Sequence, residues 1–288
     1  MTSAEQFGTC SKKPRGRGMA RESIQLIEAM AEIAEAEQPI TGRGVGYQLF
    51  TRRLIPSMSR ADMQRVYRLL LKAREDGIIP WEWIVDETRD IERVAAWDDP
   101  EQYARVVARS YRRDFWNQQS RRVMVLSEKG TVRGVLRPVL DEFAVGFLVL
   151  HGFSGATTVR DLATDDDGRP LIALYVGGWD PSGLYMSQHD LPDRLRRYGG
   201  DHVELRRIAL LKEDVAGLPS FPASAKRRDP RYEWFRRRSG DRCWELDAMD
   251  PRDLRLRVEH EIQALIDPVR GNAAPASITP SRNPCGRF

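Results

Sequence analysis

The spacing of apolar residues changes once along the chain, near residue 120. Before that point they recur every three or four positions, which places them on one face of a helix. This spacing predicts helices over three segments: 21–37, 41–52 and 59–76. The apolar, aromatic segment Ile78–Asp86 follows and predicts a strand pair or wing. Three helices and a short β element are typical of a winged helix-turn-helix domain, which we expect over 21–88; a plain three-helix packing unit is the alternative.

After residue 120, short apolar runs alternate with amphipathic segments. The runs predict strands over 123–126, 147–150, 171–176 and 203–209, and helices are expected between them over 132–142, 157–163 and 184–198. This alternation is typical of a parallel α/β domain, which we place at 121–267. The continuous apolar run Leu171–Val176 is typical of a strand buried on both faces. We expect a helical connector over 89–120 and disordered tails over 1–20 and 268–288.

Two acidic residues follow predicted strands of this α/β domain. Glu128 comes after the strand at 123–126, and Asp180 lies in a turn after Leu171–Val176. The carboxyl ends of the strands are where open α/β sheets bind ligands. Two such carboxylates could converge on one divalent cation, because hard cations prefer oxygen ligands. The alternative is that both acids only cap the helices that follow.

Composition narrows the class of protein only slightly. The 288 residues are 41% hydrophobic, which suits a globular chain with a core, and no apolar run is long enough to span a membrane. The basic N-terminal segment has no apolar stretch and does not resemble a secretory signal. The cysteines, Cys10, Cys243 and Cys285, lie too far apart for a zinc motif or a disulfide framework, so we expect a reducing cytoplasm. A net charge of +4 weakly favours a polyanionic partner.

Basic residues gather in two segments that suit contact with nucleic acid. The first is the predicted helix over 59–76, with Arg60, Arg65, Arg68 and Lys72 on its surface. The second runs from Lys226 to Arg238 and begins with Lys226, Arg227 and Arg228, followed by aromatic residues. Such segments can contact phosphates and stack on bases. The alternative is that the basic residues are only solvated and the aromatic ones dock on the core.

Glycines after His151 lie between a predicted strand and a predicted helix, as in a phosphate-binding loop. The segment lacks the lysine of a Walker motif, so we do not expect nucleotide hydrolysis. His151 at the strand end could be a base or a hydrogen-bonded structural residue.

Three motifs in this order resemble those of the A subunit of type IIB topoisomerases (topoisomerase VI) and of the related meiotic double-strand-break transesterase. Arg43-Gly44-Val45-Gly46-Tyr47 is similar to the family's Arg-Asp-Ile-Tyr-Tyr element, Glu128 to its strand-end glutamate, and Asp180-Pro181-Ser182-Gly183 to the second half of Asp-x-Asp-Pro-x-Gly. The resemblance covers roughly 21–267. It implies a winged helix followed by a Toprim domain, the α/β domain that binds magnesium in this family.

The resemblance also implies a mechanism and partners. Tyr47 would be the nucleophile that attacks a DNA phosphodiester, Arg43 would stabilise the phosphate, and Glu128 and Asp180 would hold Mg²⁺. The family's tyrosine and metal site meet across a homodimer, and strand passage needs a separate ATPase subunit. A cytoplasmic, nucleoid-associated protein is therefore expected. Gly178 stands where the family has its first aspartate, so one metal carboxylate is missing.

Two other functions remain compatible with the same residues. The first is a non-catalytic DNA-binding protein whose metal site is degraded, which Gly178 favours. The second is a metal-dependent Toprim nuclease that uses metal-bound water and forms no covalent intermediate. Without the resemblance, Tyr47 would be interpreted as a core tyrosine on a short amphipathic helix.

Overall fold

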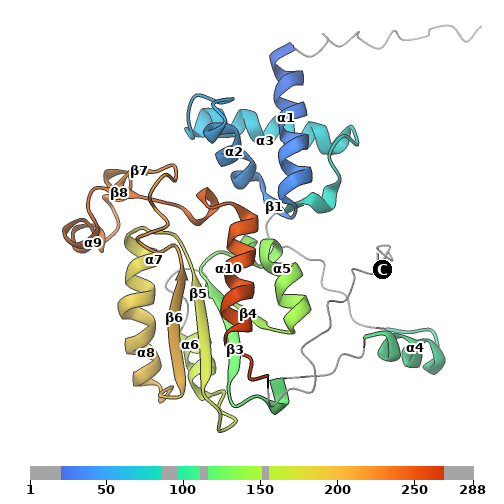
Figure 1. Cartoon of the computed structure of the whole chain (residues 1–288), viewed down its shortest axis with the longest axis vertical. Helices are drawn as coiled ribbons and strands as arrows, with labels where there is room; N and C mark the ends of the chain where they lie inside the picture. Colours follow the sequence, from blue (N-terminus) through green and yellow to red (C-terminus); the bar gives the residue numbers. More distant parts are fainter. Residues whose placement is uncertain (1–20, 86–95, 111–115, 151–155, 269–288) are drawn as a thin grey trace, which may run out of the picture.

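The computed structural model describes residues 21–85, 96–110, 116–150 and 156–268 (Figure 1). His151 and nearly all of both expected tails lie outside these described residues, so the predictions made for them stay predictions. The described chain contains a helical N-terminal unit and a mixed α/β unit, as the change of apolar spacing predicts. None of the described helices combines the length and the apolarity needed to cross a membrane.

The N-terminal unit consists of three helices around a shared apolar core. They are α1 (Arg21–Glu37), α2 (Gly42–Thr51) and α3 (Arg60–Glu75), which confirms the three helices predicted from periodicity. Thr41 and Ser59 cap α2 and α3 by accepting hydrogen bonds from the backbone N–H of residues 44 and 62. The core includes Met30, Ile33 and Leu49, all fully buried.

The predicted strand pair or wing at Ile78–Asp86 is wrong for the residues that the structure describes. Trp81–Trp83 forms a 3₁₀ turn, and only Ile84–Val85 is a strand, β2. It pairs in parallel with β1 (Ile40–Thr41), which precedes α2, instead of forming a hairpin with a neighbouring segment. Pro80 explains part of this difference, because its fixed φ and missing N–H favour a turn over a continuous ladder.

The α/β unit is built on a parallel sheet of four strands, as expected. The strands are β3 (Arg122–Ser127), β4 (Gly146–Val149), β5 (Leu171–Val176) and β6 (Val203–Ala209), in the order β4-β3-β5-β6. Every residue of β5 is buried, because this central strand is covered on both faces. Since β3 and β5 are neighbours, Glu128 and Asp180 leave the sheet at the same edge.

Helices cover both faces of the sheet (Figure 1). On one face α5 (Thr131–Phe143) and α10 (Pro251–Gln263) share a core with alternate strand residues such as Val125 and Leu174. On the other face α6 (Ala156–Thr164) and α8 (Leu191–Arg197) contact the remaining strand residues, such as Ala173 and Tyr175. The alternation of side chains along each strand produces these two separate cores.

The helix predicted over 184–198 is split. It comprises α7 (Pro181–Tyr185), a π-helical turn η3 (Met186–Asp190) and α8, which begins beside Pro192. A proline cannot donate the hydrogen bond that continues an α-helix, and here the turn before Pro192 is π-helical.

After β6 the chain forms a small subdomain beside α7. It contains the antiparallel pair β7 (Phe221–Pro222) and β8 (Arg242–Cys243), the 3₁₀ turn η4 (Ala223–Lys226) and α9 (Tyr232–Ser239). Phe235 and Cys243 are fully buried against Leu184 of α7. The aromatic side chain of Phe235 therefore docks on the core, which was one of the two alternatives for this basic segment.

Of the expected connector, the described part contains α4 (Pro100–Ser110) and a 3₁₀ turn, η2 (Trp116–Gln118). The helical unit contacts the α/β unit directly through β2 and α5. A Cβ on Gly134 of α5 would lie 2.5 Å from Val85 Cγ1, so this glycine permits the close approach of the helix. The 3₁₀ turn η5 (Leu246–Ala248) and the preceding residue, Glu245, add further contacts to α2 and to its N-cap, as described below.

Candidate functional site

Glu128 and Asp180 converge at the carboxyl edge of the sheet. Asp180 is the N-cap of α7: its Oδ1 accepts hydrogen bonds from Gly183 N at 2.8 Å and from Ser182 Oγ at 3.2 Å. Glu128 is partly buried and is not a cap, because the N-cap of α5 is Gly130, which has no side chain to accept a hydrogen bond. Capping therefore accounts for Asp180 and leaves Glu128 without a structural role of that kind.

The two carboxylates influence each other electrostatically. Burial, and next the negative charge of Asp180, raise the pKa of Glu128 against the opposing effects of Lys129, Lys226 and Arg207. Burial would also raise the pKa of Asp180, but the charge and hydrogen bond of Lys226, together with the hydrogen bonds from Gly183 and Ser182, outweigh it, so that this pKa is lowered. Two ionised carboxylates in a buried site lower the stability of the folded protein unless a cation lies beside them.

Lys226 supplies that cation in the structure. Its Nζ donates to Asp180 Oδ2, and the side chain of Asp180 is 4% exposed whereas that of Lys226 is 31% exposed. The sequence places Lys226 in a predicted DNA-binding segment, and the structure places its ammonium group on the candidate metal carboxylate instead. Arg227 and Arg228, the next two residues, are exposed.

Arg207 holds the turn that carries Asp180. It lies on β6 opposite Tyr175 of β5, and its guanidinium donates to the carbonyl oxygens of Gly177 and Gly178 at 2.9 and 2.6 Å. It also donates to the carbonyl oxygen of Gly183 at 3.0 Å. Arg207 is not among the site residues predicted from the sequence; its signal is a basic pair, Arg206 and Arg207, inside a strand segment that ends in apolar residues.

A divalent cation at this edge would have two carboxylates from the described residues. Asp180 Oδ1 serves the helix cap, which leaves Oδ2 and the carboxylate of Glu128 for a cation, and Lys226 must then leave Oδ2. A Cβ on Gly178 would meet the carbonyl oxygen of Trp244 at 3.0 Å, so the backbone crowds any side chain at this position. In the part of the chain that the structure describes, no three His, Cys, Asp or Glu side chains form a metal-binding group. A divalent cation bound by Glu128 and Asp180 alone would keep several water ligands.

Tyr47 and Arg43 lie one turn apart on α2 and face the α/β unit. Arg43 donates to Glu245 Oε1 at 2.7 Å, and its guanidinium lies 5.8 Å from the centre of the Tyr47 ring. Tyr47 is only 5% exposed. Burial, and then the charge of Glu245, raise the pKa of Tyr47 to about 12, against the opposing effect of Arg43. In this arrangement Tyr47 is a weaker nucleophile than a free tyrosine, because its ionised form is disfavoured.

A second acid from the same segment links the two units. Asp247 Oδ1 accepts from Thr41 Oγ1 at 2.7 Å, and its Oδ2 pairs with Lys129 Nζ at 3.0 Å. Lys129 also lies 3.6 Å from Glu245 Oε2. Residues 128 and 129 thus belong to two adjoining clusters: Glu128 to the carboxylate pair, Lys129 to the cluster around Tyr47. Glu245 and Asp247 are not among the site residues predicted from the sequence, and they lie more than 200 residues from their partners, Arg43 and Thr41.

The predicted DNA-binding residues of α3 are partly engaged in local ion pairs. Arg65 pairs with Glu22 at 3.0 Å, and Lys72 pairs with Asp76 at 2.8 Å. Arg60 and Arg68 are exposed on the same helix. Both ion pairs lie at the surface, where such pairs contribute little to the stability of the fold. Their basic side chains can therefore exchange these partners for DNA phosphates.

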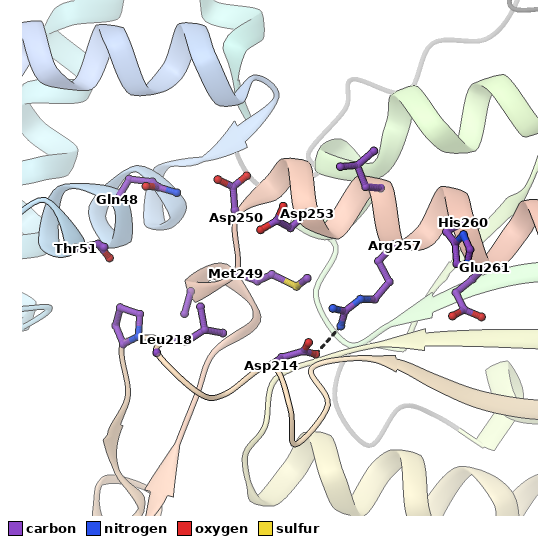
Figure 2. A pocket seen from close by; sticks show the side chains of 14 residues that line it. Gln48, Thr51, Asp214, Leu218, Met249, Asp250, Asp253, Arg257, His260 and Glu261 are labelled. Carbon is purple, nitrogen blue, oxygen red and sulfur yellow. Dashed lines mark hydrogen bonds and ion pairs between the residues drawn. The ribbon is translucent and has the colours of Figure 1, made fainter.

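A separate groove of about 630 Å³ lies between α2, α10 and the segment after β6 (Figure 2). Its charged lining is mainly acidic, with Asp250, Asp253 and Glu261, and Arg257 is paired with Asp214 at 2.5 Å. None of the sequence-predicted site residues lines it, and its acidic character does not suit a nucleic acid.

Comparison with models of known protein families and with curated protein sequences found no match for this chain.

Proposed function

We propose that the protein binds DNA and acts on it as a topoisomerase VI A-like transesterase, with Tyr47 as nucleophile and Glu128 and Asp180 as the Mg²⁺ ligands. The observation that carries this proposal is the adjoining position of the two clusters, linked by consecutive residues Glu128 and Lys129. It supports a site in which a phosphodiester contacts the cluster of Tyr47 and Arg43 beside the carboxylate pair.

In the proposed reaction the hydroxyl oxygen of Tyr47 attacks the phosphorus of a DNA phosphodiester. The phenol loses its proton as the phosphotyrosine bond forms, the bond to one sugar oxygen breaks, and that oxygen takes up one proton and leaves as a hydroxyl group, so no net proton is gained or lost. Arg43 stabilises the negative charge that develops on the phosphate oxygens. When bound, Mg²⁺ would supply further stabilisation of that charge. Homodimerisation and a separate ATPase subunit are parts of the proposal that come from the family resemblance.

Two contacts must change before this reaction can take place. Tyr47 must gain access to the phosphate from its buried position, and Arg43 must exchange Glu245 for that phosphate. A DNA phosphate is a suitable replacement partner, because Arg43 keeps its charge and phosphate oxygens accept hydrogen bonds from a guanidinium as a carboxylate does.

A non-catalytic DNA-binding protein is the second candidate. The contact of Lys226 with Asp180 favours it, since a lysine there neutralises the site without metal. The backbone carbonyl of Trp244 in the space beside Gly178 favours it as well.

DNA binding is tested by the salt dependence of affinity for a labelled duplex. We expect the Arg60→Ala, Arg68→Ala double variant to weaken binding on all sequences and to reduce the slope of log K against log salt by about 2. Arg137, an exposed arginine on α5, provides the matched control, and Arg137→Ala should leave the slope unchanged. Equal slopes for the double variant and the wild type would exclude α3 as the DNA-binding surface.

Cleavage of a supercoiled plasmid in Mg²⁺ distinguishes the transesterase, the hydrolytic nuclease and the non-catalytic DNA-binding protein. Loss of cleavage in both Tyr47→Phe and Glu128→Gln supports the transesterase. Cleavage that survives Tyr47→Phe but not Glu128→Gln indicates a hydrolytic Toprim nuclease. Salt-dependent DNA binding without cleavage by the wild type supports the non-catalytic binding protein.

A further inference from the structure

We infer that Lys226 is a tethered cation that competes with a divalent metal ion for Asp180, and so controls whether the carboxylate site is loaded. The inference rests on the proposed role of Glu128 and Asp180 as metal ligands. It assigns to Lys226 a function that differs from DNA contact.

The hydrogen bonds of Asp180 determine which oxygen is contested. Oδ1 accepts from Gly183 N and Ser182 Oγ and is committed to the start of α7. Oδ2 is the oxygen that faces Lys226. A metal ion that bridges Asp180 and Glu128 would use this Oδ2, so the ammonium group and the metal ion exclude each other at one atom.

The difference in exposure makes Lys226 the partner that can leave. Asp180 is buried at the end of β5 and fixed by its cap, whereas Lys226 ends the turn η4 with nearly a third of its side chain in solvent. Its Nζ also lies 5.8 Å from the centre of the Phe221 ring. A change of rotamer can therefore move the ammonium group into water without unfolding the subdomain that carries it.

The other cations near the carboxylates cannot make the same exchange. Arg207 is held by backbone carbonyls, including those of Gly177 and Gly178. Lys129 is paired with Asp247 and Glu245. Lys226 is thus the cation of this group that forms an ion pair with Asp180 itself. Replacing its single positive charge by a divalent ion also relieves the repulsion between Asp180 and Glu128.

The test measures metal binding in the absence of DNA, with Mn²⁺ as the probe and the electron paramagnetic resonance signal of free Mn²⁺ as the readout. Lys226→Met keeps the length of the side chain and removes its charge. We expect this variant to bind Mn²⁺ at least about tenfold more tightly than the wild type. Arg227→Met, at the exposed neighbouring position, should bind as the wild type does. Adding Glu128→Gln to Lys226→Met should abolish the gain.

The outcomes separate this inference from the proposed function. If the wild type and Lys226→Met bind Mn²⁺ with equal affinity, and Glu128→Gln does not bind it, Lys226 does not compete with the metal ion. The metal site itself then stands. If neither the wild type nor Lys226→Met binds Mn²⁺, both the competition and the proposed metal site are wrong.

A second measurement uses the wild-type protein and so does not depend on the folding of a variant. An amine-reactive reagent is applied with and without Mg²⁺, and modified lysines are quantified by mass spectrometry. Mg²⁺ should increase the modification of Lys226 several-fold, while that of the exposed Lys212 stays constant. Unchanged modification of Lys226 at saturating Mg²⁺ would contradict the inference.

Discussion

Lys226 and Asp180 form an ion pair in which the acid is buried and the base is partly exposed. The pair lies where the sequence motif predicts a metal ligand, and it joins the subdomain of β7, β8 and α9 to the end of β5. Because Asp180 cannot reach solvent, the stability of the folded chain depends on the cation beside it.

Lys226→Met should therefore destabilise the protein by about 3 kcal/mol at pH 7, since it leaves a buried carboxylate without its cation. Lys226 lowers the pKa of Asp180 against the opposing effect of burial. Stability from this pair is thus present above the unfolded pKa of an aspartate and is lost as the pH falls through the lower folded value. Urea unfolding measures the change, and Arg227→Met should stay within about 0.5 kcal/mol of the wild type. A comparable loss in both variants would refute a specific role for the pair.

Glu37 at the end of α1 should make stability depend on pH near neutrality. Burial raises its pKa to about 7, assisted by Asp250 and opposed by Arg252. A raised carboxyl pKa means that stability is full below the unfolded pKa and is lost as the pH rises through about 7. We expect the wild type to lose about 1 kcal/mol between pH 6 and pH 8, and Glu37→Gln to lose less. Glu32→Gln, at an exposed position of the same helix, should keep the wild-type slope.

Substitution of Gly178 should destabilise the turn that carries Asp180. A Cβ there would meet the carbonyl oxygen of Trp244 at 3.0 Å, and that oxygen is fixed by a 2.8 Å hydrogen bond from Trp179 N. We expect Gly178→Ala to cost roughly 1–3 kcal/mol, and Gly178→Asp to fail to recreate a second metal site. Gly146→Ala is the control, because a Cβ at Gly146 makes only ordinary contacts beginning at 3.6 Å. If Gly178→Ala is as stable as the wild type, the Trp244 carbonyl moves aside at little cost in free energy, and the prediction is wrong.

Glu245→Gln should lower the pKa of Tyr47 from about 12, because after burial the charge of Glu245 is the main influence that raises it. The change also releases Arg43 from its ion pair and leaves a positive charge closer to the phenol. Alkaline titration of tyrosinate absorbance, with Tyr47→Phe subtracted in each background, measures the shift. Glu213→Gln, at an exposed position, should leave the titration of Tyr47 as it is. An unchanged Tyr47 titration in Glu245→Gln would mean that burial alone sets the pKa.

The sequence predicts the helices and strands well where one pattern extends over a whole element. The periodicity of α1 and the continuous apolar run of β5 each identify a complete element, and the motif at Asp180 identifies its place after β5. Periodicity carries no information on the partners of Ile84–Val85, so the pairing with β1 could not be predicted. Prolines at 80 and 192 account for the other local differences.

The candidate site could be predicted only in part, because its contacts join distant segments. Glu245 and Asp247 reach α2 across more than 200 residues, and no local pattern indicates that pairing. Lys226 lies in a run of basic residues that is typical of a DNA-binding surface, and only the folded position of η4 reveals its contact with Asp180. The residues that hold or neutralise the side chains of the sequence motifs are thus the ones that could not be predicted from the sequence.

Trapping of a covalent protein–DNA adduct tests the central claim most directly. The protein is incubated with supercoiled DNA and Mg²⁺ and denatured rapidly, and protein-linked breaks are counted. The proposed function predicts an adduct in the wild type, none in Tyr47→Phe, and an unchanged yield in Tyr67→Phe, the matched tyrosine on the exposed surface of α3. An adduct that persists in Tyr47→Phe, or DNA binding by the wild type without any adduct in Mg²⁺, would contradict it.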